Sequence, residues 1–133
     1  MREIKFRAKS GTQWRFGDLY HNERGELMIY EPLSRGRTLD GVPFDGWRIV
    51  VDPETVGQFT GVLDCEGREI YEGDVIQIVT KNPYWAFKKN YAVYWDLDGF
   101  CLEGEPLYYW FKLHDLKVIG NAHDNPELLE RMI

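Results

Sequence analysis

The sequence predicts a mainly β protein with an N-terminal antiparallel meander, a small C-terminal barrel and one short terminal helix. Short apolar and β-branched runs alternate with turns rich in Gly, Asp and Asn along most of the 133-residue chain. Aromatic residues make up 15% of the sequence, and Trp and Tyr favour sheets and contact surfaces over helices. The clearest helix-capping pattern lies close to the C-terminus.

The first strands are expected at residues 4–8 and 14–20, which begin with alternating apolar and basic side chains, and at the apolar run 27–30. Gly17-Asp18 indicates a bend inside the second of them. Residues 31–46 contain two prolines and three glycines, so we expect a long loop there, with a small hairpin at Asp40-Gly41. Such a loop is either functional or a disordered crossover.

A strand is expected at 47–51. Either a single turn of helix or a type I turn follows at 52–55, because Pro53 stands at a position that favours turns. A weak boundary near Asp52-Pro53 divides the chain into an N-terminal β subdomain, 1–52, and a barrel subdomain, 53–133.

The stretch from residue 56 to 79 holds three short apolar runs separated by glycine-containing turns. Gly61, Gly67 and Gly73 are interpreted as structural turn residues, and Asp74 as a side chain that caps backbone amides. A strand rather than a helix follows Gly73, so this turn is not a phosphate-binding loop. Residues 75–79 are β-branched and predict a buried strand.

Later strands are expected at 92–95, 100–102, 108–111 and 116–120, with a hairpin turn at 97–100. The terminal helix is expected at 126–132, with Asn125 as N-cap and Pro126 at its first position. Residues 108–111 are four consecutive aromatics, which cannot all point inward from one strand. They favour burial between subdomains or a homo-oligomeric contact.

Residues 81–91 interleave three lysines with four aromatics in an otherwise acidic chain. The partner-binding candidates in this stretch are Tyr84, Trp85, Phe87, Lys88 and Lys89. Their aromatic rings could stack on unpaired bases while lysines neutralise phosphates. They could equally anchor a protein partner or a second copy, or pack on their own barrel.

The three histidines give no metal, cofactor or catalytic site by their spacing. His114-Asp115 and His123-Asp124 are adjacent pairs, and adjacent strand residues point to opposite faces. They are therefore interpreted as solvated turn residues. A hydrolase would need at least two of a set of five residues close to one point. That set is Asp18, His21, His114, Asp115 and His123.

Composition bounds the class of protein. The net charge of -6 argues against a general nucleic-acid coat, although it allows a local basic patch. No apolar run approaches the roughly 18 residues of a membrane span, and residues 1–7 do not form a signal peptide. We therefore expect a soluble cytoplasmic protein without a membrane partner. Cys65 is expected in an exposed turn and Cys101 in the core, without a disulfide.

Several segments, in order along the chain, resemble the YopX family of small proteins encoded by phages and prophages. The segments are residues 2–8, 56–61, 64–74, 118–121 and 125–129, of which 64–74 matches the most specific motif. The resemblance implies a mainly β fold, an SH3-like character for the C-terminal barrel, and a location in the host cell. It implies no catalytic residues.

The function that we expect is a non-enzymatic phage accessory protein that works by binding a host or phage protein or by self-association. A nucleic-acid partner is a weaker alternative. The alternative enzyme class is a metal-dependent hydrolase that acts on nucleic acid.

Overall fold

The computed structural model describes residues 3–39, 42–79, 90–96 and 99–129, and of residues 33–39 and 42–45 only the backbone. The chain forms two compact units, Met1–Gln58 and Phe59–Ile133. The boundary between the units lies between Gln58 and Phe59, inside a strand. The sequence predicts a boundary a few residues earlier, near Asp52-Pro53. Strands dominate both units, which confirms the mainly β prediction.

The first unit is an antiparallel meander in which consecutive strands are neighbours. Its elements are β1 (Phe6–Ser10), β2 (Gln13–His21), β3 (Leu27–Leu39), β4 (Val42–Val50) and the 3-10 turn η1 (Pro53–Thr55). Gly57 and Gln58, at the start of β5 (Gly57–Leu63), pair with β1. Asp52 caps η1 by accepting the Glu54 N–H at 3.0 Å, and the helical turn itself lies where the sequence predicts a turn.

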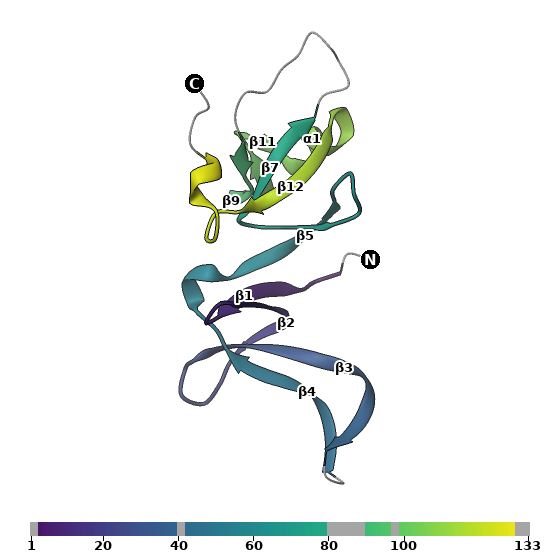
Figure 1. The fold of residues 1–133 in the computed structure, drawn as a ribbon, viewed down its shortest axis with the longest axis vertical. Helices are drawn as coiled ribbons and strands as arrows, with labels where there is room; N and C mark the ends of the chain where they lie inside the picture. The colour runs from purple at the N-terminus through teal and green to yellow at the C-terminus, as the bar shows by residue number, and fades with distance from the viewer. Residues whose placement is uncertain (1–2, 40–41, 80–89, 97–98, 130–133) are drawn as a thin grey trace. The chain divides into compact units, whose positions relative to one another are not determined.

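The prediction of a long loop at 31–46 is wrong, because β3 and β4 extend through these residues as a long hairpin (Figure 1). Strand β2 accompanies β3 only as far as Tyr30, so the hairpin beyond is two-stranded and tolerates proline. The register shifts after Pro32, which faces Gly46. The predicted Asp40-Gly41 turn lies outside the described residues, although Leu39 and Val42 pair on either side of it.

Glycine is required at two positions of this meander because neighbouring backbones approach closely. A Cβ at Gly17 would lie 2.0 Å from the Tyr30 carbonyl oxygen, and one at Gly46 would lie 2.4 Å from that of Glu31. The core of the unit lies on one face of the sheet. Ala8, Ile29 and Val51 are buried there, against Phe6, Leu19, Leu27, Ile49 and Val56.

The second unit combines short antiparallel strands with one helix. Its elements after β5 are β6 (Glu69–Tyr71), β7 (Asp74–Val79), β8 (Tyr91–Ala92), β9 (Tyr94–Asp96), β10 (Gly99–Leu102), β11 (Glu105–Pro106), α1 (Leu107–Leu113), β12 (Asp115–Asn121) and η2 (Pro126–Leu129). Strands β12, β7 and β8 form one sheet, and β11, β10 and β9 form another, while β5 pairs with β6. Within the described residues no sheet closes into a barrel.

The two sheets separate at Val93, which lies between β8 and β9. Its backbone N–H and C=O bond to Asp74 and Gly73, and its side chain is buried. The core around it contains Ile70, Ile76, Ile78, Val93, Phe100, Leu102, Leu107 and Leu116. Strand β7 pairs with β12, which lies far from it in the sequence, and this pairing joins the beginning of the unit to its end. The two strands lie side by side in Figure 1.

Two elements of the second unit differ from expectation. Residues 108–111 form the middle of helix α1 rather than a strand, because Leu107 and Trp110 anchor one side of it in the core. The terminal helix is the 3-10 turn η2, and residues 130–132 lie outside the described part. The Asn125 side chain accepts the Asn121 N–H at 3.3 Å instead of capping η2.

Candidate partner-binding face

The predicted partner-binding residues of the 81–91 stretch lie outside the described residues. These are Tyr84, Trp85, Phe87, Lys88 and Lys89, and their role stays a prediction. The described end of the stretch is built into the second unit. Asn90 donates to the Leu128 carbonyl at 2.9 Å, and Tyr91 pairs with Ile76. Burial raises the pKa of Tyr91, and the negative charge of Glu103 raises it further.

Helix α1 carries the largest group of exposed apolar side chains among the described residues of the second unit. The exposed fractions are 59% for Tyr108, 47% for Tyr109, 46% for Phe111 and 52% for Leu113. Exposed apolar groups gathered in this way commonly mark interaction sites. We call these four residues the α1 face.

The rings of the α1 face are held in defined positions by one another and by the helix. The centroids of Tyr108 and Phe111 lie 6.2 Å apart with stacked planes, and Lys112 Nζ lies 5.2 Å from the Tyr108 centroid. Tyr109 meets Trp110 edge to face at 5.6 Å. Trp110 in turn donates through Nε1 to the Leu102 carbonyl at 2.6 Å, so the helix is tied to β10.

A helical spacing could have revealed this face in the sequence. Leu107, Trp110 and His114 are three and four residues apart, and they are the positions of this segment that are turned toward the protein. The aromatic run outweighed that spacing in the sequence, since aromatics favour strands. Burial of residues 108–111 between subdomains and contact with another molecule both stay predictions.

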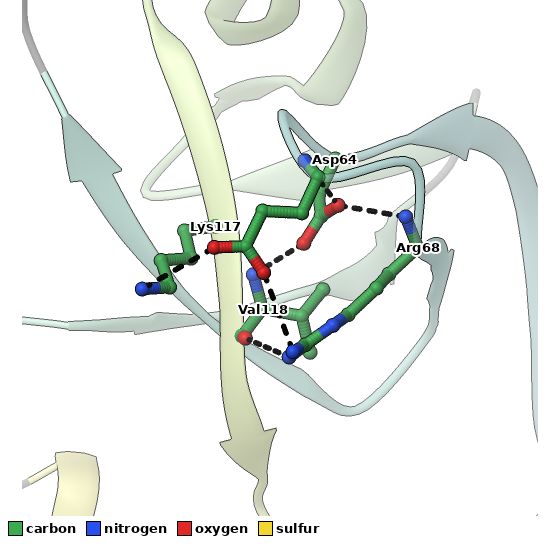
Figure 2. A network of polar contacts seen from close by, with 5 residues as sticks. Asp64, Arg68, Lys117 and Val118 are labelled. Carbon is green, nitrogen blue, oxygen red and sulfur yellow. Dashed lines mark hydrogen bonds and ion pairs between the residues drawn. The ribbon is translucent and has the colours of Figure 1, made fainter.

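The turn that connects β5 with β6 is organised by one buried carboxylate, Asp64 (Figure 2). Its Oδ1 accepts the N–H groups of Glu66 at 2.9 Å and Arg68 at 2.8 Å. Its Oδ2 accepts the Val118 N–H, from β12, at 3.0 Å. Asp64 is therefore a structural residue that joins the turn to β12.

Three backbone donors determine the charge state of this carboxylate. Burial alone would raise the pKa of Asp64, but the N–H groups of Val118, Arg68 and Glu66 and the charge of Arg68 outweigh it. The pKa is therefore lowered below its ordinary value of 3.8. Asp64 remains ionised at neutral pH.

Charged side chains complete the outer part of the turn. Glu66 pairs with Arg68 at 3.3 Å and with Lys117 at 3.5 Å, and Arg68 Nη1 also donates to the Val118 carbonyl at 3.3 Å. These contacts are exposed, so each contributes little stability. Their effect is to hold both cations at Glu66.

A small hollow of about 60 Å³ lies between this turn and helix α1. Its lining residues are Leu63, Asp64, Cys65, Phe111, His114, Asp115 and Leu116. Phe111 belongs both to the hollow and to the α1 face. A larger depression of about 340 Å³ lies at the β2–β3 turn, where Asn22, Glu23, Arg24 and Glu26 line it.

The predicted turn residues are three glycines with positive φ angles and one capping carboxylate. The φ angles of Gly61, Gly67 and Gly73 are 85°, 82° and 93°, a region that favours glycine. Asp74 is buried and accepts the Tyr71 N–H through Oδ2 at 2.7 Å, which is the contact expected of a turn-capping carboxylate.

The three histidines differ in exposure. His21 and His123 are exposed, as expected, but His114 is buried and its ring lies 5.8 Å from that of Trp110. The interpretation of His114 as solvated is therefore wrong. His114 is the C-cap residue of α1 and lies on the same buried side of the helix as Leu107 and Trp110. Among residues whose placement is described, no three His, Cys, Asp or Glu side chains are arranged to hold a metal ion.

Both cysteines are unbridged; Cys65 is exposed as expected, whereas Cys101 is half-buried rather than part of the core. None of the helices in the described part of the chain has the length and apolar character that crossing a membrane requires.

Comparison with known proteins supports the fold and identifies the family. Protein EF1440 from Enterococcus faecalis, known from a crystal structure, is 20% identical, with a TM-score of 0.60 over 98% of this chain and 100% of that one. No curated protein matches the sequence. The model of the YopX protein family matches residues 5–130, so the chain belongs to the YopX family.

Proposed function

We propose that the protein is a non-enzymatic binding module that docks a protein partner on the α1 face. The observation that carries the proposal is the exposure of Tyr108, Tyr109, Phe111 and Leu113 on one short helix whose inner side is fixed in the core. Rigid aromatic side chains lose little entropy on binding and dominate interface energetics. As its resemblance implies, we propose that it serves as a phage or prophage accessory protein in the host cytoplasm, with an SH3-like second unit.

The distribution of charge favours a different protein over a second copy as the occupant. Residues 1–58 carry nine Lys and Arg against nine Asp and Glu, whereas residues 59–133 carry seven against thirteen. The second unit therefore accounts for the whole net charge of -6. Two copies that met through it would repel each other, especially at low salt.

The test uses Tyr109→Ser, with Phe16→Ser as the matched control. Phe16 is 45% exposed and lies in the first unit, so the control removes a similar area elsewhere. We expect a protein captured from host lysate after nuclease treatment, and then purified, to bind Tyr109→Ser about 10-fold more weakly than wild type. Phe16→Ser should bind normally, and both variants should keep the wild-type melting temperature within a few degrees.

Three results would contradict the proposal. Equal binding of the captured protein to both variants would remove the α1 face from the interface. Light scattering that shows a stable dimer lost in Tyr109→Ser would make a second copy the occupant. Metal-dependent cleavage of nucleic acid by the purified protein would support the hydrolase class instead.

A further inference from the structure

We infer that the hollow beside α1 receives the ammonium or guanidinium end of a Lys or Arg side chain from the partner that lies on the α1 face. This inference rests on the proposed function and specifies the chemistry of its partner. The observation behind this inference is that Phe111 lines the hollow and is also part of the α1 face. A segment that covers the α1 face therefore passes the mouth of the hollow.

The lining of the hollow selects positive charge. Among the described residues that line it, Asp64 and Asp115 are carboxylates and none is Lys or Arg. Arg68 of the turn and Lys117 of β12 are both held by Glu66, and Lys112 of α1 lies over the Tyr108 ring. The other titratable groups of the lining are the Cys65 thiol and the His114 ring. A cation from outside would meet carboxylates in a partly water-excluded site, where their attraction is stronger than in bulk water.

Size and apolar lining point to the end of a side chain rather than to a free ligand. About 60 Å³ is far below the roughly 300–1,000 Å³ of pockets that bind small molecules or cofactors. Leu63, Leu116 and the Phe111 ring provide an apolar wall for the methylene stem of Lys or Arg. The charged end would then reach the carboxylates, and the aromatic ring adds an attraction for cations.

Cys65 provides a reporter inside the hollow. In a Cys101→Ser background, its thiol is modified with two methanethiosulfonates of similar size, one bearing a trimethylammonium group and one a sulfonate. The reference is Leu129→Cys in a Cys65→Ser, Cys101→Ser background, since Leu129 is 37% exposed on the same unit. The ratio of cationic to anionic rates should be at least about 10-fold higher at Cys65 than at the reference.

Asp115→Asn should reduce that ratio about threefold or more, and the melting temperature of the variant is measured beside it as a check on the fold. Equal ratios at the two positions, or a ratio unaffected by Asp115→Asn, would overturn the cation site. Either result would leave the α1 face untouched, because the reference and the Asp115 variant both keep Tyr108, Tyr109 and Leu113.

A second measurement uses amide chemical shifts with two synthetic peptides, one of alternating leucine and lysine and one of alternating leucine and glutamine. We expect the lysine peptide to bind about 10-fold more tightly and to shift the amides of Cys65, His114 and Asp115. Equally tight binding of both peptides would overturn the cation site while supporting the apolar face. Binding of the lysine peptide that survives Tyr109→Ser would contradict the proposed function instead.

Discussion

At the scale of single residues, Asp64 shows how one side chain can join distant parts of a sequence. Its partners at Glu66 and Arg68 are local, but the third donor, Val118, is 54 positions away. A carboxylate has enough acceptor sites for all three donors, whereas an amide offers one oxygen and places an NH₂ group against a backbone N–H. The residue therefore stabilises the turn and the β12 contact together.

We predict that Asp64→Asn lowers the free energy of unfolding at pH 7 by about 1–3 kcal/mol, since one buried N–H loses its acceptor. The lowered pKa of Asp64 also makes stability depend on pH. The contribution is fully present above the unfolded value near 3.8, and it is lost as the pH falls through the lower folded value. Denaturant titrations between pH 2 and 7 should show a smaller acid-induced loss in the variant.

Asp96→Asn is the control, because Asp96 is an exposed residue of the same unit. It should leave both the stability at pH 7 and its acid dependence close to wild type. A wild-type pH profile in Asp64→Asn would mean that other carboxylates govern acid unfolding.

At the scale of elements, β2 and β3 approach each other more closely than a side chain allows. Gly17 and Gly99 have nearly the same φ, 156° and 155°, but only Gly17 has a neighbouring backbone within 4 Å of its Cβ position. The pair therefore separates the effect of crowding from the effect of backbone conformation.

We predict that Gly17→Ala destabilises the protein by about 2 kcal/mol or more, because the Tyr30 carbonyl must move and the β2–β3 pairing with it. Gly99→Ala should cost about 1 kcal/mol or less, since only the dihedral preference of glycine is lost. Thermal and denaturant unfolding of the two variants give the comparison. Equal losses would show that β2 and β3 relax apart without cost.

At the scale of the whole molecule, the two units differ in core size and charge. Among the side chains that the structure describes, three buried apolar residues form the core of the first unit and eight form that of the second. Hydrophobic burial is the main favourable term in folding, so the second unit should open less often. The net charge of -6 sits in that same unit, where it opposes close approach of identical copies.

Hydrogen exchange tests this difference in stability. Amides at Ile76 and Leu116 should exchange at least about 10-fold more slowly than amides at Ala8 and Ile29. The core with more buried apolar surface has the larger free energy of opening. Equal protection of the two sets would indicate that both units open in a single cooperative step.

Local sequence patterns are enough to predict the β class, most strand positions, the glycine turns and the membership of a family. Alternating polarity and turn residues act locally, so they can be recognised one segment at a time. The aromatic run at residues 108–111 and the glycines and prolines of 31–46 were misread because their local preferences oppose the structure that forms.

The conformation of those two segments and the composition of the candidate site depend on contacts between distant parts of the chain. Helix α1 forms because Leu107 and Trp110 find a core to enter, and the β3–β4 hairpin forms because each strand satisfies the backbone of the other. The hollow beside Phe111 brings Asp64 together with Asp115, which are 51 positions apart. No local pattern encodes this juxtaposition, because it depends on the hydrogen bonds between the β5–β6 turn and β12, from the Cys65 N–H to the Leu116 carbonyl and from the Val118 N–H to Asp64.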